Sequence, residues 1–244
     1  MTVLEALAVL AAGTVAGGVN AVVGSGSLIT FPTLLAVGYS PVTANVSNCV
    51  GLVPGGVSGS FGYRRELRGQ WRRCGILGVG TTIGAVLGGV LLLVLPDAVF
   101  DAIVPALILL AVGLMAFRPA PKPHVDGANM AAGVASSFGT GIYGGYFGAA
   151  QGIILVSLLR LSFPYDLQVL NAMKNVLAGL ANAVAGVLFI IVADVAWGAA
   201  LLIAAGSLVG AAVGARYGRR IPSEILRRIV IVYGAIVAVI LIIT

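Results

Sequence analysis

Long apolar runs separated by short polar turns fill most of the chain, and their lengths predict helices rather than strands. The runs long enough for full helices lie at about 4–22, 41–62, 72–95, 98–117, 128–146, 165–192, 196–217 and 222–243. Two shorter runs, at about 27–38 and 150–162, cannot cross a bilayer of about 30 Å as straight helices. The pattern predicts an all-α, polytopic membrane helix bundle in which each half contains a glycine-rich break and a short re-entrant segment or half-helix.

The composition supports a bilayer as the solvent of these helices. Of the 244 residues, 59% are hydrophobic and 9% are charged, whereas soluble domains carry about 25% charged residues. The net charge of +6 comes from arginines and lysines in short turns between apolar runs. Basic residues at such places orient a membrane protein, so we expect a lipid bilayer and no nucleic acid as a partner.

The basic residues also predict the orientation of the helices. All except Lys174 fall in turns that we place in the cytoplasm: Arg64, Arg65, Arg68, Arg72, Arg73, Arg118, Lys122, Arg160, Arg216, Arg219, Arg220, Arg227 and Arg228. The turns that hold Asp97 and Asp194 carry no basic residue and face outside. With this arrangement both termini lie outside.

Glycines and a proline that recur at one offset indicate an internal repeat. The pairs, each 126 positions apart, are Gly80 and Gly206, Gly84 and Gly210, Gly88 and Gly214, and Pro96 and Pro222. We divide the chain into a first membrane repeat at 1–117, a cytoplasmic Pro-rich connector at 118–127 and a second membrane repeat at 128–244. The charge pattern gives the halves opposite orientations, an inverted-topology repeat typical of secondary transporters. A duplicated membrane protein without transport activity would show the same pattern.

The two glycine-containing breaks are the first candidates for a binding site. A broken helix at membrane depth requires cover from protein or from a water-filled cavity. The short helix after each break presents free N–H groups and the positive end of its dipole, which suits an anion. The candidate residues at the breaks are Ser25, Gly26, Ser27, Gln151 and Gly152. The alternative is a structural kink with no ligand.

Lys174 lies inside an apolar run with no acidic residue three or four positions away. Because a charge at that depth is costly, such residues usually face a cavity. Asn171 and Asn175 share its helical face. The equivalent positions of the first half are occupied by Asn45, Ser47 and Asn48. The alternatives are snorkelling or a bond to backbone carbonyls for Lys174, and bonds to neighbouring helices for the amides and hydroxyls.

The residues needed for catalysis or metal binding do not form a recognisable pattern. His124, the one histidine, lies in the Pro-rich connector, and Cys49 and Cys74 have no metal-ligand spacing. Paired carboxylates inside the apolar runs and a GxxxxGK[ST] loop are both absent from the sequence. We therefore expect neither an enzyme nor a cofactor or metal site.

Two motifs, one in each half, resemble the TauE/SafE family of sulfite-exporter-like permeases. The first is Gly24-Ser-Gly-Ser-Leu-Ile-Thr-Phe-Pro-Thr-Leu-Leu35 followed by Ala44-Asn-Val-Ser-Asn48. The second is Tyr143-Gly-Gly-Tyr-Phe-Gly-Ala-Ala-Gln-Gly-Ile-Ile-Leu155 followed by Asn171-Ala-Met-Lys-Asn175. The resemblance covers essentially the whole chain. It implies transport of sulfite, of sulfonates such as sulfoacetate, or of related organosulfur anions across the bacterial inner membrane.

The leading hypothesis is a secondary transporter of a small anion, a sulfur oxyanion or organosulfonate, that works by alternating access of two inverted repeats. The sequence leaves open whether a proton or a sodium ion is coupled to transport, and whether the protein forms a homodimer. The alternatives are a passive anion channel and a non-transporting membrane partner of a sulfur-metabolism enzyme.

Overall fold

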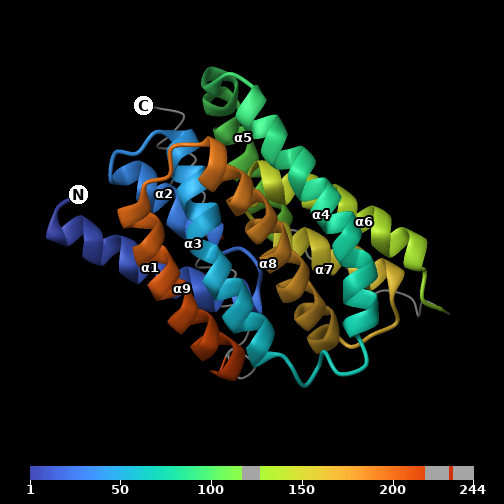
Figure 1. Ribbon diagram of the computed structural model, residues 1–244. Coiled ribbons are helices and arrows are strands. Elements are labelled where there is room, and N and C mark those ends of the chain that lie inside the picture. Colours follow the sequence, from blue (N-terminus) through green and yellow to red (C-terminus); the bar gives the residue numbers. More distant parts are fainter. Residues whose placement is uncertain (117–126, 218–230, 233–244) are drawn as a thin grey trace.

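The computed structural model describes residues 1–116, 127–217 and 231–232, and this part of the chain is an all-helical bundle (Figure 1). Its helices are α1 (Val3–Val22), α2 (Ser27–Ala36), α3 (Pro41–Gly62), α4 (Trp71–Val94), α5 (Asp97–Ala116), α6 (Met130–Tyr146), α7 (Gln151–Ser162), α8 (Leu167–Val192) and α9 (Trp197–Tyr217). Each confirms a predicted segment, with ends that differ by at most about two residues. Almost all of the predicted helix at 222–243 and of the connector at 118–127 lies outside the described residues.

Local sequence signals set several helix starts. Thr2 and Glu5 form a capping box at the start of α1, in which each side chain bonds the other residue's backbone N–H. Ser40 caps α3 and Pro41 opens its first turn. Asn129 caps α6 by accepting a hydrogen bond from the N–H of Ala132.

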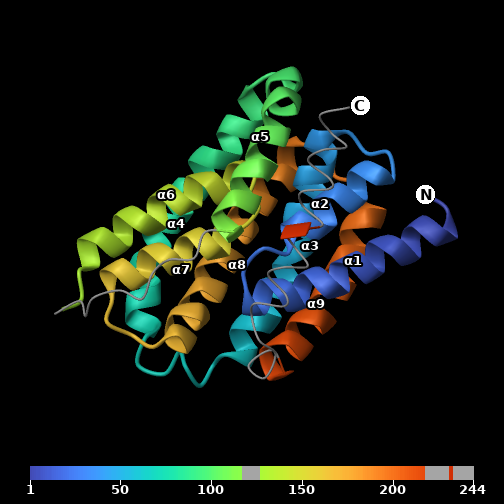
Figure 2. The ribbon, with the colours of Figure 1, turned by 180° about the vertical axis from the view of Figure 1, so that it is seen from behind.

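Four of the described helices are long and apolar enough to cross a membrane: α1, α4, α8 and α9. The helices α2 and α7 have 10 and 12 residues and are therefore only about 15–18 Å long. Both follow a break and fold back beside the preceding helix. The backbone N–H of Asn129, before α6, donates to Ser162 O at the end of α7 at 2.8 Å, and Figure 2 shows α7 beside α6. The pair therefore starts and ends on the same side of the bundle.

Glycine seams join the two halves. Gly80, Gly84 and Gly88 of α4 face the backbone of α6, and Gly206, Gly210 and Gly214 of α9 face the backbone of α1. The neighbours match position by position: Gly84 lies against Phe138 and Ile142, and Gly210 lies against Thr14 and Gly18. A Cβ at either glycine would overlap a backbone carbonyl oxygen. Close backbone approach therefore explains these glycines.

The helices α3 and α8, which the predicted repeat equates, run in opposite directions. Gly56 of α3 lies against Gly179 of α8, while Val50, earlier in α3, lies against Gly186, later in α8. These contacts make α3 and α8 antiparallel where they cross at the centre of the bundle (Figure 1). In contrast, α3 runs parallel to α9, because Gly51 and Gly55 meet Ile203 and Ser207 in turn.

The described arginines gather at one end of the bundle. The guanidinium of Arg73, in the first turn of α4, lies 5.4 Å from the ring centroid of Tyr165, just before α8. Gly62 packs on Ala215, so the ends of α3 and α9 meet there too. From this end α4 and α8 run in parallel to the opposite end, where they are followed by Asp97 and Asp194. The predicted orientation across a membrane stays a prediction, and this separation of charge fits it.

Candidate functional site

The two breaks have the same backbone cap. At the end of α1, Val19 O accepts hydrogen bonds from the N–H groups of Val23 and Gly24. At the end of α6, Tyr143 O accepts the corresponding bonds from Phe147 and Gly148. Gly24 has φ +90° and Gly148 has φ +75°, a left-handed conformation that glycine adopts without steric cost. These two glycines therefore end the two helices in the same way.

The breaks also touch each other at the centre of the bundle. The backbone N–H of Gly152, in the first turn of α7, donates to Gly24 O at 3.1 Å. A Cβ on either residue would lie 2.6 Å from the Cα of the other. Gly152 is therefore required for the close approach of the two halves, and Gly24 for both the approach and the turn.

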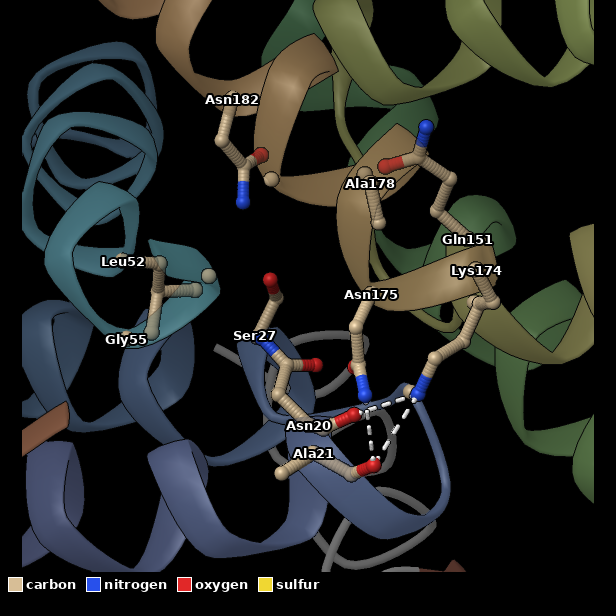
Figure 3. A pocket seen from close by; sticks show the side chains of 15 residues that line it. Asn20, Ala21, Ser27, Leu52, Gly55, Gln151, Lys174, Asn175, Ala178 and Asn182 are labelled. Atoms are coloured by element: carbon tan, nitrogen blue, oxygen red, sulfur yellow. Dashed lines mark hydrogen bonds between the residues drawn. The ribbon is translucent and has the colours of Figure 1, made fainter. Parts of the chain in front are cut away.

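A cavity of about 30 Å³ lies beside this contact (Figure 3). It is lined by the ends of α1 and α6, the starts of α2 and α7, and the central helices α3 and α8. Its lining residues are Asn20, Ala21, Gly24, Ser27, Leu52, Gly55, Gly56, Gly148, Gln151, Gly152, Lys174, Asn175, Ala178, Gly179 and Asn182. Among these, Lys174 alone has an ionisable side chain.

Lys174 reaches from α8 to the carboxyl end of α1. Its side chain is 1% exposed, and its Nζ donates to Asn20 O at 2.7 Å and to Ala21 O at 3.5 Å. Asn171 and Asn175 place their Nδ2 atoms 3.1 Å from the same Ala21 oxygen. Figure 3 shows Lys174 and Asn175 converging on the two carbonyl groups. The last turn of a helix leaves its carbonyls without backbone partners, and here α8 supplies the donors.

The corresponding end of α6 is held by a neutral group. Asn45 of α3 donates from Nδ2 to Tyr146 O at 2.9 Å. Asn48, which the 126-residue offset equates with Lys174, instead accepts a hydrogen bond from the hydroxyl of Thr30. The two helix ends thus share a backbone cap, but in the described part of the chain only the end of α1 receives a lysine side chain.

The structure brings some of the predicted site residues to the cavity and places others beside it. Ser27, Gln151, Gly152, Lys174 and Asn175 line the cavity. Six lie outside its lining and are buried between helices: Ser25, Gly26, Asn45, Ser47, Asn48 and Asn171. Gly26 N–H bonds Asn20 Oδ1 at 2.8 Å, and Ser47 Oγ accepts from Ala196 N at 2.8 Å. These two bonds fit the alternative role predicted from the sequence, in which polar side chains hold neighbouring segments together without a ligand.

Asn182 lines the cavity but was not among the predicted site residues. It lies seven positions after Asn175, hence two helical turns along the same face of α8. The seven-residue spacing from Asn175 could therefore have indicated Asn182 from the sequence alone. Its backbone carbonyl accepts a bond from Cys49 Sγ at 3.4 Å. Within the described ranges, no three His, Cys, Asp or Glu side chains come together as a metal site would require.

Comparison with known proteins places the chain among membrane transporters. The family described as sulfite exporter TauE/SafE matches residues 9–241. A probable membrane transporter protein of Haemophilus influenzae is 28% identical over 235 residues, covering 94% of this chain and 91% of that protein. The probable membrane transporter protein ORF9 of a Sinorhizobium species is 25% identical, with 92% and 87% covered. The probable membrane transporter protein YfcA of Escherichia coli K12 is 23% identical, with 91% and 84% covered. No solved structure gives a significant match.

Proposed function

The chain belongs to the sulfite exporter TauE/SafE family, and from this membership and the central cavity we propose that it is a secondary transporter of a small anion. The proposed substrate class is a sulfur oxyanion or a small organosulfonate, and the proposed site is the cavity beside Lys174. The observation that carries the proposal is the buried amino group of Lys174, the one ionisable group on a lining of amides, a hydroxyl, glycines and three apolar side chains.

The chemistry of the lining suits an anion. An ammonium has three N–H donors, and the two hydrogen bonds described for Lys174 go to the carbonyls of α1. The third donor serves a ligand in the cavity, together with the amides of Asn175 and Asn182 and the hydroxyl of Ser27. A positive charge in a low-dielectric site attracts an anion far more strongly than it would in water.

The small cavity corresponds to a closed conformation of the transporter. A volume of about 30 Å³ holds roughly one or two water molecules, and an anion with four or more heavy atoms needs more space. Substrate entry therefore requires the two halves to separate at the cavity. The matched seams of α4 on α6 and α1 on α9, and the opposite directions of α3 and α8, support an inverted repeat. In such a repeat, exchange of the two packings opens the site to either side.

The first experiment is thermal unfolding of the purified protein against sulfite, thiosulfate, sulfate, sulfoacetate, taurine, acetate and chloride. A ligand that binds only the folded state at 100 times its Kd stabilises it by about 2.7 kcal/mol. We expect stabilisation by one sulfur anion and its loss in Lys174→Met, with Asn48→Ala at the equivalent position as the matched control. A panel without any shift, or an equal shift in Lys174→Met, would contradict the proposed site.

A second experiment tests transport itself. Proteoliposomes loaded with the stabilising anion should accumulate labelled anion by exchange, at a rate that saturates with external concentration. Single-channel conductance in planar bilayers would contradict a carrier and support a channel. Binding without any flux would support a non-transporting partner protein.

A further inference from the structure

The carboxyl end of α1 has the ligands of a cation site. The carboxyl end of a helix carries about half a negative charge, spread over its unpaired carbonyls. The last turn of α1 contains no basic residue, and Asn20 O and Ala21 O receive the ammonium of Lys174 from α8. Among secondary transporters, the carboxyl ends of broken helices coordinate sodium ions or protons.

The charge at this place is balanced by carbonyl dipoles rather than by a carboxylate. No acidic residue occurs in α2, α3, α7 or α8, and the one acidic residue of α1 is Glu5, in its first turn. A single positive charge surrounded by neutral oxygen atoms matches a monovalent cation. Divalent ions usually require carboxylate ligands.

The fold does not need a charge to end a broken helix. The break after α6 has the same backbone cap, and a neutral amide, Asn45, meets its carbonyl. The residue equivalent to Lys174 is Asn48, which bonds Thr30 of its own half. A purely structural role would therefore be met by an amide, and the lysine adds a charge that the repeat does not require.

We propose that the Lys174 ammonium is a tethered cation that fills a monovalent-cation site at the end of α1, in the place where a free coupling ion would bind. The native protein then needs no free cation at this place. When the lysine side chain is removed, a free cation binds the same carbonyls. The candidates are sodium, potassium and methylammonium, the last being the closest mimic of the lysine head group. The proposal goes beyond the anion site, because it concerns the oxygen ligands of α1 and holds for any substrate.

Two variants of Lys174 separate the charge from the space it occupies. Lys174→Ala removes the ammonium and leaves room for an ion, whereas Lys174→Met removes the charge and fills the space with an apolar chain. Both purified variants and the native protein are unfolded thermally in choline gluconate, with sodium, potassium or methylammonium replacing choline at constant ionic strength. At ten times its Kd, a cation shifts the folding equilibrium about elevenfold, a rise in Tm on the order of 3 °C.

The expected result is that Lys174→Ala regains stability with at least one small cation while Lys174→Met and the native protein do not respond. An equal response of all three proteins, or no response of Lys174→Ala, would overturn the proposal. If Lys174→Ala does not fold, Lys174→Ser keeps a hydroxyl for the carbonyls and leaves similar room, so the same titration applies. Stabilisation of the native protein by sodium would also overturn it. No test anion is varied, so a negative result here leaves the anion carrier standing.

Discussion

The ends of α1 and α6 have the same backbone cap and different side-chain partners. Both finish in a left-handed glycine, Gly24 or Gly148, and both place their last carbonyls against a central helix of the other half. At α6 the donor is one neutral amide, and at α1 the donors are two amides and a buried ammonium. The two helix ends share a backbone cap, and they differ at Lys174, whose counterpart at the 126-residue offset is Asn48. This difference is where the proposed anion site obtains its charge.

The largest expected effect on stability tests the glycine seams, which have the same form in both halves of the chain. Gly84→Ala in α4 and Gly210→Ala in α9 each place a Cβ into the backbone of the neighbouring helix. We expect each to cost about 2–3 kcal/mol, because the seam must separate. The measurement is the thermal unfolding of purified protein, with yield from size-exclusion chromatography.

Gly75→Ala, in the same helix as Gly84, is the matched control, since a Cβ there meets nothing within 4 Å. It should be neutral or slightly stabilising, because alanine favours helix over glycine. Similar losses for Gly84→Ala and Gly210→Ala would support equivalent seams. A loss in one variant and none in the other would contradict the equivalence.

The sequence was sufficient for the helices because their apolar lengths and their glycine and proline turns are local signals. The boundaries at Ser27 and Gln151 followed from the glycines that precede them. The contact between Gly24 and Gly152, 128 positions apart, could not be predicted, since it depends on how the two halves pack. For Lys174 the sequence indicated burial and a polar partner, and left open whether that partner was a ligand or the end of another helix.

The second largest expected effect on stability tests a difference between the two breaks, namely how closely other residues pack around Gly24 and around Gly148. Gly24→Ala and Gly148→Ala both force a side chain into a left-handed backbone, which costs about 1–2 kcal/mol. At Gly24 the new Cβ also meets the Cα of Gly152 at 2.6 Å, whereas at Gly148 its nearest neighbour is Gly144 O at 3.1 Å. We therefore expect Gly24→Ala to lose more stability than Gly148→Ala in thermal unfolding. Equal losses would show that the contact between the breaks is loose.

The smallest effect tests the donors at the two helix ends. Asn45→Ala removes the one side-chain donor described for Tyr146 O, and a hydrogen bond of this kind contributes about 0.5–1.5 kcal/mol to stability. Asn171→Ala should cost less, because Ala21 O keeps its bonds from Lys174 and Asn175. Thermal unfolding of both variants gives the difference.

The same comparison can be made within one half by a double-mutant cycle. If Lys174 and Asn171 share the carbonyls of α1, then Asn171→Ala should cost more in a Lys174→Met background than in the native protein. Additive losses would mean that the ammonium contributes nothing to holding α1. Coupling between the two substitutions would show that Lys174 and Asn171 hold the end of α1 together in the folded protein, because each partly compensates for the loss of the other.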